Sequence, residues 1–355
     1  MIPLPEREGQ GVGAEHSEAP AFDPPPTPPC QGGELESYLR NRIAATGPIT
    51  VADFMAAANA HYYATRDPLG QAGDFVTAPE ISQMFGEIIG AAFAEAWVRA
   101  GSSDNAIYAE LGPGRGTLAA DALRVMRRAG FAGEVHLVET SPPLRNMQVA
   151  LLPDAVFHES IAELPPRPLL LIANEFFDAF PIEQWIGDEQ RKITHDGTCF
   201  AFTIDGPIRE TSPARDAAAA ALADHLARHG GAALVIDYGY SNGERGDTFQ
   251  AVRGHVFADP LAEPGETDLT AHVDFAALAS AANACTVSRV ATQGSWLEAL
   301  GIGPRAAALA ARNPDQTADL AAARRRLCDT AEMGQFFKVM SLRHPDWPAI
   351  AGLEQ

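Results

Sequence analysis

Three glycines at alternating positions, Gly112, Gly114 and Gly116, stand between a short apolar run and a stretch with helical periodicity in "AIYAELGPGRGTLAADALR" (106–124). A strand, a glycine-rich turn and a helix in this order form the ligand cradle of doubly wound folds. A dinucleotide-binding turn, GxGxxG, would need its third glycine at the position of Thr117. The spacing GxGxG therefore favours a nucleoside without a pyrophosphate, and an ordinary tight turn is the alternative.

Two carboxylates accompany these glycines. Glu110 lies two residues before Gly112, and Glu139 ends the next expected strand. Small turn residues let the backbone approach a nucleoside, and a carboxylate at the neighbouring strand end can accept hydrogen bonds from both ribose hydroxyls. This combination is typical of a site for S-adenosylmethionine (SAM), and it weakens the ordinary-turn alternative.

A third group of polar residues lies in "ANEFFDAFPIEQW" (173–185), which contains Asn174, Glu175 and Asp178. The segment follows the strand expected beside the glycine strand, at the point where the strand order of the sheet reverses. Asn174 and Glu175 are therefore expected to face the methyl group of the cofactor. Glu183, further along, is expected to belong to an inserted hairpin instead.

Alternating strands and helices would position these residues. The pattern predicts strands at 106–111, 134–139, 155–157 and 168–173 and helices at 117–129 and 143–150. Such alternation implies an α/β fold of the class I SAM-methyltransferase type. Its sheet would be doubly wound and mostly parallel, with helices on both faces.

Further elements are expected around this sheet. Two helices precede it, one in "ELESYLRNRIAAT" and one after the cap residue Thr50, and Pro79 is expected to open a long apolar helix. Alternating residues and an "HDG" turn in 182–211 predict an inserted antiparallel hairpin. The Gly- and Asp-rich stretch 239–270 is expected to form a functional loop or lid. A C-terminal helical elaboration to about residue 332 and a last strand in "GQFFKVMSL" would follow.

The chain divides accordingly into four parts. Residues 1–33, rich in Pro, Gly and Glu, are expected to be a disordered tail. The other expected parts are an N-terminal helical segment with an active-site loop at 34–104, the methyltransferase domain at 105–343 with insertions at 182–211 and 239–332, and a C-terminal tail at 344–355.

The charge balance limits the partners. A net charge of −20, from 26 Lys and Arg against 46 Asp and Glu, disfavours nucleic acid, whose phosphates need a basic surface. A cationic partner fits better, and an acidic surface that only maintains solubility is an equal alternative. No apolar run is long enough to span a bilayer, and the acidic N-terminus lacks the pattern of a signal or transit peptide. We therefore expect a cytoplasmic protein.

Seven strings of the chain resemble, in the same order, motifs of the MidA family: "GDFVTAPEISQMFGE", "ELGPGRGT", "LVETSPPLR", "ANEFFDAFP", "VIDYGY", "DPLAEPGETDLTAHVDF" and "GQFFKV". The resemblance covers about residues 34–343. It is specific because several rare strings agree at once. His61, Phe249 and Phe336 depart from the family pattern, and none of these departures removes a polar group from the expected site.

The resemblance implies an activity. MidA proteins are SAM-dependent protein-arginine methyltransferases connected with the assembly of respiratory complex I, and S-adenosylhomocysteine is the product formed from their cofactor. The resemblance implies symmetric ω-dimethylation of an arginine in a quinone-side subunit of complex I. It also implies a bacterial cytoplasmic protein, or a protein of the mitochondrial matrix if the source is eukaryotic. The oligomeric state stays open.

The resemblance extends the cofactor site to the segment "GDFVTAPEIS", which would line the SAM pocket with Asp74, Thr77 and Glu80. Glu80 has an alternative role, since an acid in a first helical turn stabilises the helix dipole. The full expected cofactor-binding set is Asp74, Thr77, Glu80, Glu110, Gly112, Gly114, Gly116, Glu139, Ser160 and Ile161.

Catalytic roles follow from the chemistry of an arginine acceptor. Its guanidinium must be held in place and relieved of a proton as it attacks, and a carboxylate can do both while opposing its positive charge. We expect Glu175 to have this role, with support from Asp178 and Asn174. A turn cap is an equal alternative for Asp178.

Three other interpretations were weighed. Asp268, His272 and Asp274 could suggest a metal site, but scattered ligands are weak evidence and Asp274 would cap a helix at 275–283, so no metal is expected. A SAM enzyme for a small molecule would need the 239–270 loop to seal the pocket. A non-catalytic assembly chaperone that binds SAM is the third interpretation.

Overall fold

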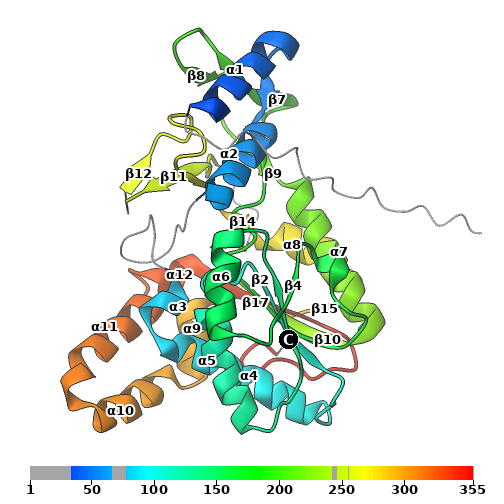
Figure 1. Ribbon diagram of the computed structural model, residues 1–355, viewed down its shortest axis with the longest axis vertical. Helices are drawn as coiled ribbons and strands as arrows, with labels where there is room; N and C mark the ends of the chain where they lie inside the picture. Colours follow the sequence, from blue (N-terminus) through cyan, green and yellow to red (C-terminus); the bar gives the residue numbers. More distant parts are fainter. Residues whose placement is uncertain (1–32, 66–76, 242–245, 255, 355) are drawn as a thin grey trace, which may run out of the picture.

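The computed structural model describes residues 33–65, 77–241, 246–254 and 256–354 (Figure 1). Its centre is a nine-stranded sheet in the order β15-β17-β10-β5-β2-β3-β4, with β14 beside β10 and β16 beside β17. The strands are β2 (Ile107–Leu111), β3 (Val135–Val138), β4 (Val156–His158), β5 (Leu169–Asn174), β10 (Gly231–Tyr240), β14 (Val273–Asp274), β15 (Thr286–Val287), β16 (Ala291–Thr292) and β17 (Phe337–Arg343).

Most of this sheet is parallel, as predicted. The strands β4, β3, β2, β5 and β10 run parallel to their neighbours, and β17 runs antiparallel to β10. Chain order reverses between β2 and β5, so this pair forms the switch point at which doubly wound sheets bind ligands. All six residues of β5 are buried because alternate side chains enter the two cores on opposite faces of the sheet.

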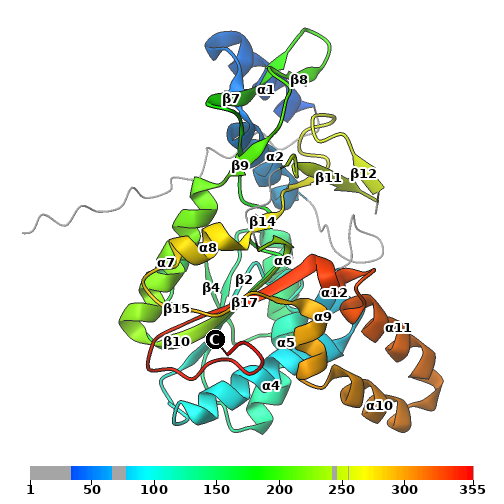
Figure 2. The same ribbon diagram turned by 180° about the vertical axis from the view of Figure 1, so that it is seen from behind.

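Helices cover both faces of the sheet (Figures 1 and 2). One core contains residues of α4 (Gln83–Arg99), α5 (Thr117–Arg128) and α9 (Gln293–Ala299). The opposite core contains residues of α7 (Pro213–His229) and α8 (Phe275–Ala281). Helix α6 (Pro142–Leu151) lies between β3 and β4 in the chain. Helices α10 (Ile302–Arg312) and α11 (Thr317–Cys328) project to one side (Figure 1). The part of the molecule around the sheet also contains the short α12 (Met333–Phe336) and the 3-10 turns η1 (Ile161–Glu163) and η2 (Pro314–Gln316).

A second unit, here called the upper unit, is assembled from three separate segments. It has its own core, in which Leu39, Ile193 and Leu269 are fully buried. Its elements are α1 (Glu34–Thr46), β1 (Ile49–Thr50), α2 (Val51–Thr65), β6 (Glu183–Ile186), β7 (Glu189–His195), β8 (Phe200–Phe202), β9 (Arg209–Thr211), β11 (Gln250–Arg253), β12 (Val256–Ala258) and β13 (Asp268–Thr270). The chain enters this unit after β5 and again after β10, so the unit stands at the carboxyl edge of the main sheet (Figure 1).

Several local predictions are confirmed. Each strand and helix predicted between 106 and 173 forms within two residues of its predicted bounds. Thr50 accepts a hydrogen bond from the Asp53 N–H at the start of α2, and Asp274 accepts two from Ala276 and Ala277 at the start of α8. The "HDG" turn joins β7 to β8 with Gly197 at φ 102°. These features depend on local chain chemistry, which a sequence displays directly.

Three expectations are wrong in detail. Pro79 lies in the short helix α3 (Ala78–Ile81), and the long helix starts only at Gln83 because Ser82 is extended and its hydroxyl accepts the Met84 N–H. The insertion at 182–211 is a four-stranded addition that pairs with β1, and is larger than one hairpin. The described part of 239–270 contains the small sheet β12-β11-β13, joined by turns, where a loop or lid was expected. In the described residues, no helix is both long enough and apolar enough to cross a bilayer.

Candidate functional site

The glycine turn lies between β2 and α5 at the switch point. Gly112, Gly114 and Gly116 all have positive φ, at 58°, 55° and 83°. A Cβ on Gly112 would lie 3.0 Å from Cδ2 of Phe176, so a side chain here would have a disfavoured backbone conformation and would require the Phe176 ring to shift. The turn therefore brings bare backbone to the N-terminus of α5, as a nucleoside site requires.

Glu139 lies at the end of β3, next to the turn. Its carboxylate accepts the Ser141 N–H at 2.8 Å and the Gln148 side-chain amide at 3.3 Å. Gln148 also donates to the carbonyl of Gly114 at 2.6 Å, so one α6 side chain joins the acid to the glycine turn. Burial raises the pKa of Glu139, and the Ser141 and Gln148 hydrogen bonds oppose that rise. The structure thus brings Glu139 and the glycines together, and it adds Gln148, which sequence reasoning missed.

Glu110 is buried directly before the glycine turn. The Tyr108 hydroxyl donates to its carboxylate at 2.6 Å. Burial raises the pKa of Glu110 to about 8, and the Tyr108 hydrogen bond lowers it in part. Direct contact of Glu110 with a cofactor stays a prediction.

The residues before α4 also reach the turn. Glu80 accepts a hydrogen bond from the Thr117 hydroxyl at 2.8 Å and lies 3.7 Å from Arg115, so it bridges α3 to the start of α5. Thr77 precedes α3, its backbone carbonyl accepting the Glu80 N–H at 3.0 Å. Asp74 lies outside the described residues. Contact of Thr77 and Glu80 with a cofactor stays a prediction.

Ser160 and Ile161 lie just after β4. Ser160 is exposed, and Ile161 packs against the core on the α7 face of the sheet. The backbone of Glu139 donates to His158 at the end of β4, so these residues follow the strand that neighbours Glu139. Their contact with a cofactor likewise stays a prediction.

Glu175 follows β5 in an unusual backbone conformation. Its φ is 48°, in the left-handed region that residues with a side chain rarely occupy. Its carboxylate accepts the Ala78 N–H at 3.3 Å and the Asn174 amide at 3.2 Å. Burial and the nearby Asp178 raise the pKa of Glu175 to about 8. Strained backbone of this kind concentrates at functional sites.

Two further acids lie near Glu175. Asp178 is hydrogen-bonded to the Tyr238 hydroxyl, and burial raises its pKa. Asp268, on β13, accepts the Tyr63 hydroxyl of α2 at 2.8 Å. The Asp178 and Asp268 charges both contribute to raising the pKa of Glu175, so both acids lie within electrostatic reach of Glu175. Sequence reasoning had assigned no role to Asp268 or Tyr63, because both come from the upper unit.

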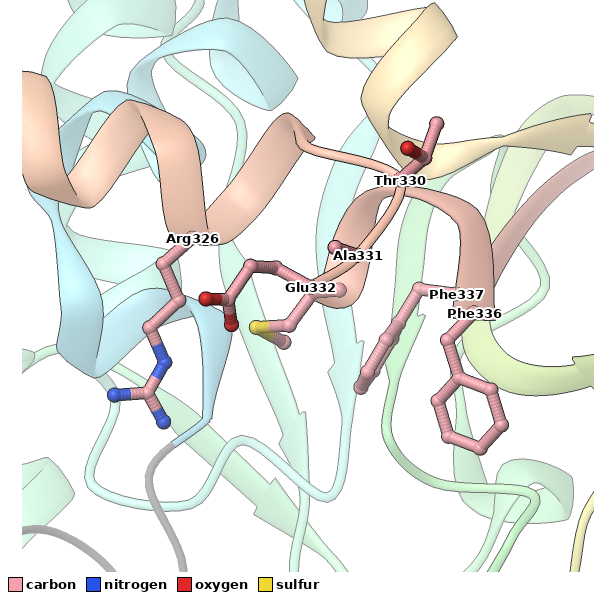
Figure 3. A pocket seen from close by; sticks show the side chains of 7 residues that line it. Arg326, Thr330, Ala331, Glu332, Phe336 and Phe337 are labelled. Carbon is pink, nitrogen blue, oxygen red and sulfur yellow. The ribbon is translucent and has the colours of Figure 1, made fainter.

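An aromatic wall adjoins the acids. The Tyr238 ring stacks on Phe336 with centroids 5.5 Å apart, and His272 meets Phe336 edge-on at 5.1 Å. Beyond Phe336 lies an open hollow of about 570 Å³ between α11, α12 and the start of β17. Figure 3 shows Phe336 and Phe337 on one side of this hollow and Arg326 and Glu332 on the other. Phe336 therefore lines this hollow and also stacks on Tyr238, whose hydroxyl bonds Asp178.

Unsatisfied polar atoms test whether a ligand fits here. Among the described residues, four such buried atoms lie at the carboxyl ends of β3 and β5 or on α6 beside them. They are Ser141 Oγ, Gln148 Oε1, Asn174 Oδ1 and Asp178 Oδ1. Buried polar atoms nearly always have a partner. Their position fits a polar ligand that extends from Glu139 to Asp178.

Comparisons with known proteins agree with this geometry. A family model described as "Putative S-adenosyl-L-methionine-dependent methyltransferase" matches residues 88–198 and 190–292. The chain is 34% identical to the mitochondrial protein arginine methyltransferase NDUFAF7 of Danio rerio, over 86% of each chain. It is 31% identical to the Homo sapiens protein of that name, over 86% of this chain and 82% of the relative.

A solved structure from Burkholderia thailandensis, with S-adenosyl-homocysteine bound, has a similar fold. Its TM-score is 0.80 at 26% identity, and the match covers 90% of this chain and 95% of the other.

Proposed function

The chain belongs to this family of S-adenosyl-L-methionine-dependent methyltransferases, and from that premise we propose that it methylates an ω-nitrogen of arginine in a protein substrate. The observation that carries the proposal is the group of acids beside the glycine turn: Glu175, Asp178 and Asp268. A guanidinium is a planar cation with five N–H donors, and facing carboxylates match both its charge and its geometry. The names of the NDUFAF7 relatives support the same substrate class.

The cofactor would lie over the carboxyl ends of β2 and β3. We propose that the glycine turn receives it and that the Glu139 carboxylate accepts its ribose hydroxyls, because the two carboxylate oxygens together can accept more hydrogen bonds than their protein donors supply. Ser141 and Gln148 each have an unsatisfied oxygen nearby for its polar groups. Bound SAM supplies an electrophilic methyl group on a positively charged sulfur.

Glu175 is proposed as the catalytic carboxylate. It would hold the guanidinium, offset its charge and accept the proton that the nitrogen loses during transfer. A pKa of about 8 leaves the free carboxyl mostly protonated near neutral pH. An arriving guanidinium favours the ionised form, since an opposite charge within a few ångströms lowers a carboxyl pKa. We propose that Asp178 and Asn174 support Glu175, and that Asp268 completes the acidic surround.

The substrate chain is proposed to approach through the hollow beside Phe336. Phe336 lines this hollow and stacks on the Tyr238 ring, whose hydroxyl bonds Asp178, so an arginine side chain would extend past Phe336 toward the acids. We propose symmetric dimethylation of a quinone-side subunit of complex I as the finer reaction. The location is proposed to be the bacterial cytoplasm, or the mitochondrial matrix in a eukaryote, as for the relatives with mitochondrial names.

A labelling experiment tests the proposal. The purified protein is incubated with methyl-labelled SAM and a protein extract from its own source cells lacking the gene, and the labelled proteins are hydrolysed to amino acids. We expect label in ω-methylarginines and none in a parallel reaction with heat-denatured protein. Label only in small molecules, or SAM binding by calorimetry without any transfer, would contradict the proposal. The first result would indicate a metabolite methyltransferase, and the second a non-catalytic chaperone.

A further inference from the structure

The backbone that follows β5 is held at every N–H from 175 to 178. The Glu175 N–H donates to the carbonyl of Ile236 at 2.8 Å. The next three N–H groups, those of Phe176, Phe177 and Asp178, all donate to one carboxylate oxygen of Asp237, at 3.2, 3.0 and 3.2 Å. Four consecutive donors therefore end on two adjacent residues of β10.

The carbonyl side of the same segment is held from α7. Arg215 is buried and donates to Phe177 at 2.8 Å, to His272 at 3.0 Å and to Ala271 at 3.3 Å. The Ala271 N–H in turn donates to the carbonyl of Asp178 at 3.0 Å. The segment after Glu175 is thus fixed to the main sheet by Asp237 and to the end of the upper unit by Arg215.

This arrangement explains how Glu175 keeps its left-handed backbone. A residue with a side chain stays at φ 48° only where its surroundings hold it there. Without the bonds to Asp237, the three N–H groups after Glu175 would be free to turn, and Glu175 could relax to a negative φ. Its carboxylate would then move away from Ala78 and Asn174.

We propose that Asp237 is a positioning residue that acts through Glu175. The side chain of Asp237 is fully buried, so it cannot touch a substrate and can act only on the segment it holds. This inference rests on the proposed function, and it adds a residue to which no chemical role had been assigned. Asp237 lies within β10. Burial and the nearby Asp178 and Glu175 raise its pKa well above the usual range, while the three convergent N–H groups all use one of its oxygens as their acceptor.

A double-mutant cycle tests the proposal. Asp237→Asn keeps the shape and replaces one of two oxygens, both of which accept backbone N–H groups, with an NH2 donor. We expect it to lower kcat for arginine methylation by about tenfold or more, since small displacements of a catalytic group have effects of that size, with SAM affinity changed less than about twofold. In a Glu175→Gln background, the same change should lower kcat less than about twofold, because the group it positions is already gone. A loss of similar size in both backgrounds, or a kcat close to wild type in the single variant, would overturn the proposal.

Matched controls separate positioning from folding. Glu87→Gln removes another buried carboxylate, which pairs with Arg305 and Arg124 between helices, and it should lower the melting temperature with kcat unchanged. If Asp237→Asn fails to fold, Arg215→Lys is used in its place. It should lower kcat in the wild-type background and change kcat little in the Glu175→Gln background, and a similar loss in both backgrounds, or a kcat close to wild type in the single variant, would again overturn the proposal. Hydrogen exchange gives a readout without activity: in either variant, amides 175–178 should exchange faster than in wild type. Unchanged exchange there would overturn the proposal even if the wild-type protein methylated no arginine.

Discussion

At the scale of single residues, the site divides between a cofactor side and an acceptor side. Glu139 and the glycine turn form the first, joined by Gln148. Glu175 and Asp178 form the second, held by Asp237 and Tyr238. The two sides meet at the switch point between β2 and β5, so changes on either side should have separable effects.

Glu139→Ala tests the cofactor side. The change removes the acceptor for the ribose hydroxyls, so SAM affinity should fall by about 1.5–3 kcal/mol, the range for hydrogen bonds to a charged group. Calorimetric titration measures it, and a melting curve checks that the fold is retained. An unchanged affinity in a folded variant would place the ribose elsewhere.

The pH dependence of kcat/KM tests the acceptor side. Burial raises the pKa of Glu175 to about 8, so the carboxyl ionises only as pH rises through that value. Because the ionised form binds the guanidinium, kcat/KM should rise up to about tenfold per pH unit below pH 8 and level off above it. The measurement uses limiting protein substrate and saturating SAM between about pH 6.5 and 8.5.

Glu110 also has a pKa of about 8, so the pH profile needs a matched variant. In Glu175→Gln the rising limb should disappear. A limb that persists in this variant would assign the titration to another buried acid of the site, such as Glu110 or Asp178, and a flat wild-type profile would argue against an ionised Glu175.

Sequence reasoning found the site residues that lie in short motifs at strand ends. Glu110, the glycines and Glu139 lie at the ends of short buried strands, a position that apolar runs and turn residues mark directly. Other site residues lie inside elements. Gln148 lies in the middle of α6, Asp237 in the interior of β10, and Arg215 in the first turn of α7. Whether these side chains point toward the site depends on which strands pair and on how the helices pack. Local periodicity in the sequence does not encode either.

At the scale of elements, the glycine turn depends on how α4 and α5 pack. Gly90 on α4 faces Ala122 on α5 so closely that a Cβ on Gly90 would lie 2.4 Å from the Ala122 carbonyl oxygen. The contact is backbone to backbone, so a side chain could be accommodated only by moving a helix. The helix that moves would be α4 or α5, and α5 carries the turn at its N-terminus.

Gly90→Ala should therefore destabilise the protein by about 1–3 kcal/mol, the usual cost of overpacking. Helix propensity alone predicts the opposite sign, since alanine stabilises a helix interior by about 1 kcal/mol relative to glycine. Urea denaturation of both proteins measures the change. Gly246→Ala is the control, because a Cβ there meets nothing within 4 Å. Equal or higher stability of the Gly90 variant would show that the helices have room to separate.

Elements of the upper unit were the hardest to predict. Strands β11, β12 and β13 are three or four residues long, too short for a clear period, so their segment was interpreted as a loop. Their pairing relies on partners distant in the chain: Asn59 of α2 bonds both the N–H and the carbonyl of Leu269. The main sheet was predictable because its strands are continuous buried runs separated by amphipathic helices.

At the scale of the whole molecule, the net charge of −20 favours a cationic substrate segment. Salt ions screen the attraction between the acidic protein and a cationic substrate segment. The KM for the protein substrate should therefore rise several-fold between about 50 and 300 mM salt, with kcat nearly constant. The affinity for SAM, a small ligand with less charge, should change less under the same conditions. A KM independent of salt would mean that the acidic surface serves only solubility.

The two units of the molecule converge on Glu175, which follows β5 of the main sheet and lies within electrostatic reach of Asp268 in the upper unit. The central claim is that this carboxylate holds and deprotonates the acceptor arginine. Glu175→Gln keeps the size and one acceptor oxygen and removes the charge.

The most direct measurement is the rate of methyl transfer to arginine by Glu175→Gln, with SAM affinity measured on the same preparation. The account predicts a loss of about 10²-fold or more in kcat, the scale for removal of an electrostatic partner of the transition state, with SAM affinity nearly unchanged. A folded variant that methylates arginine at close to the wild-type rate would contradict it.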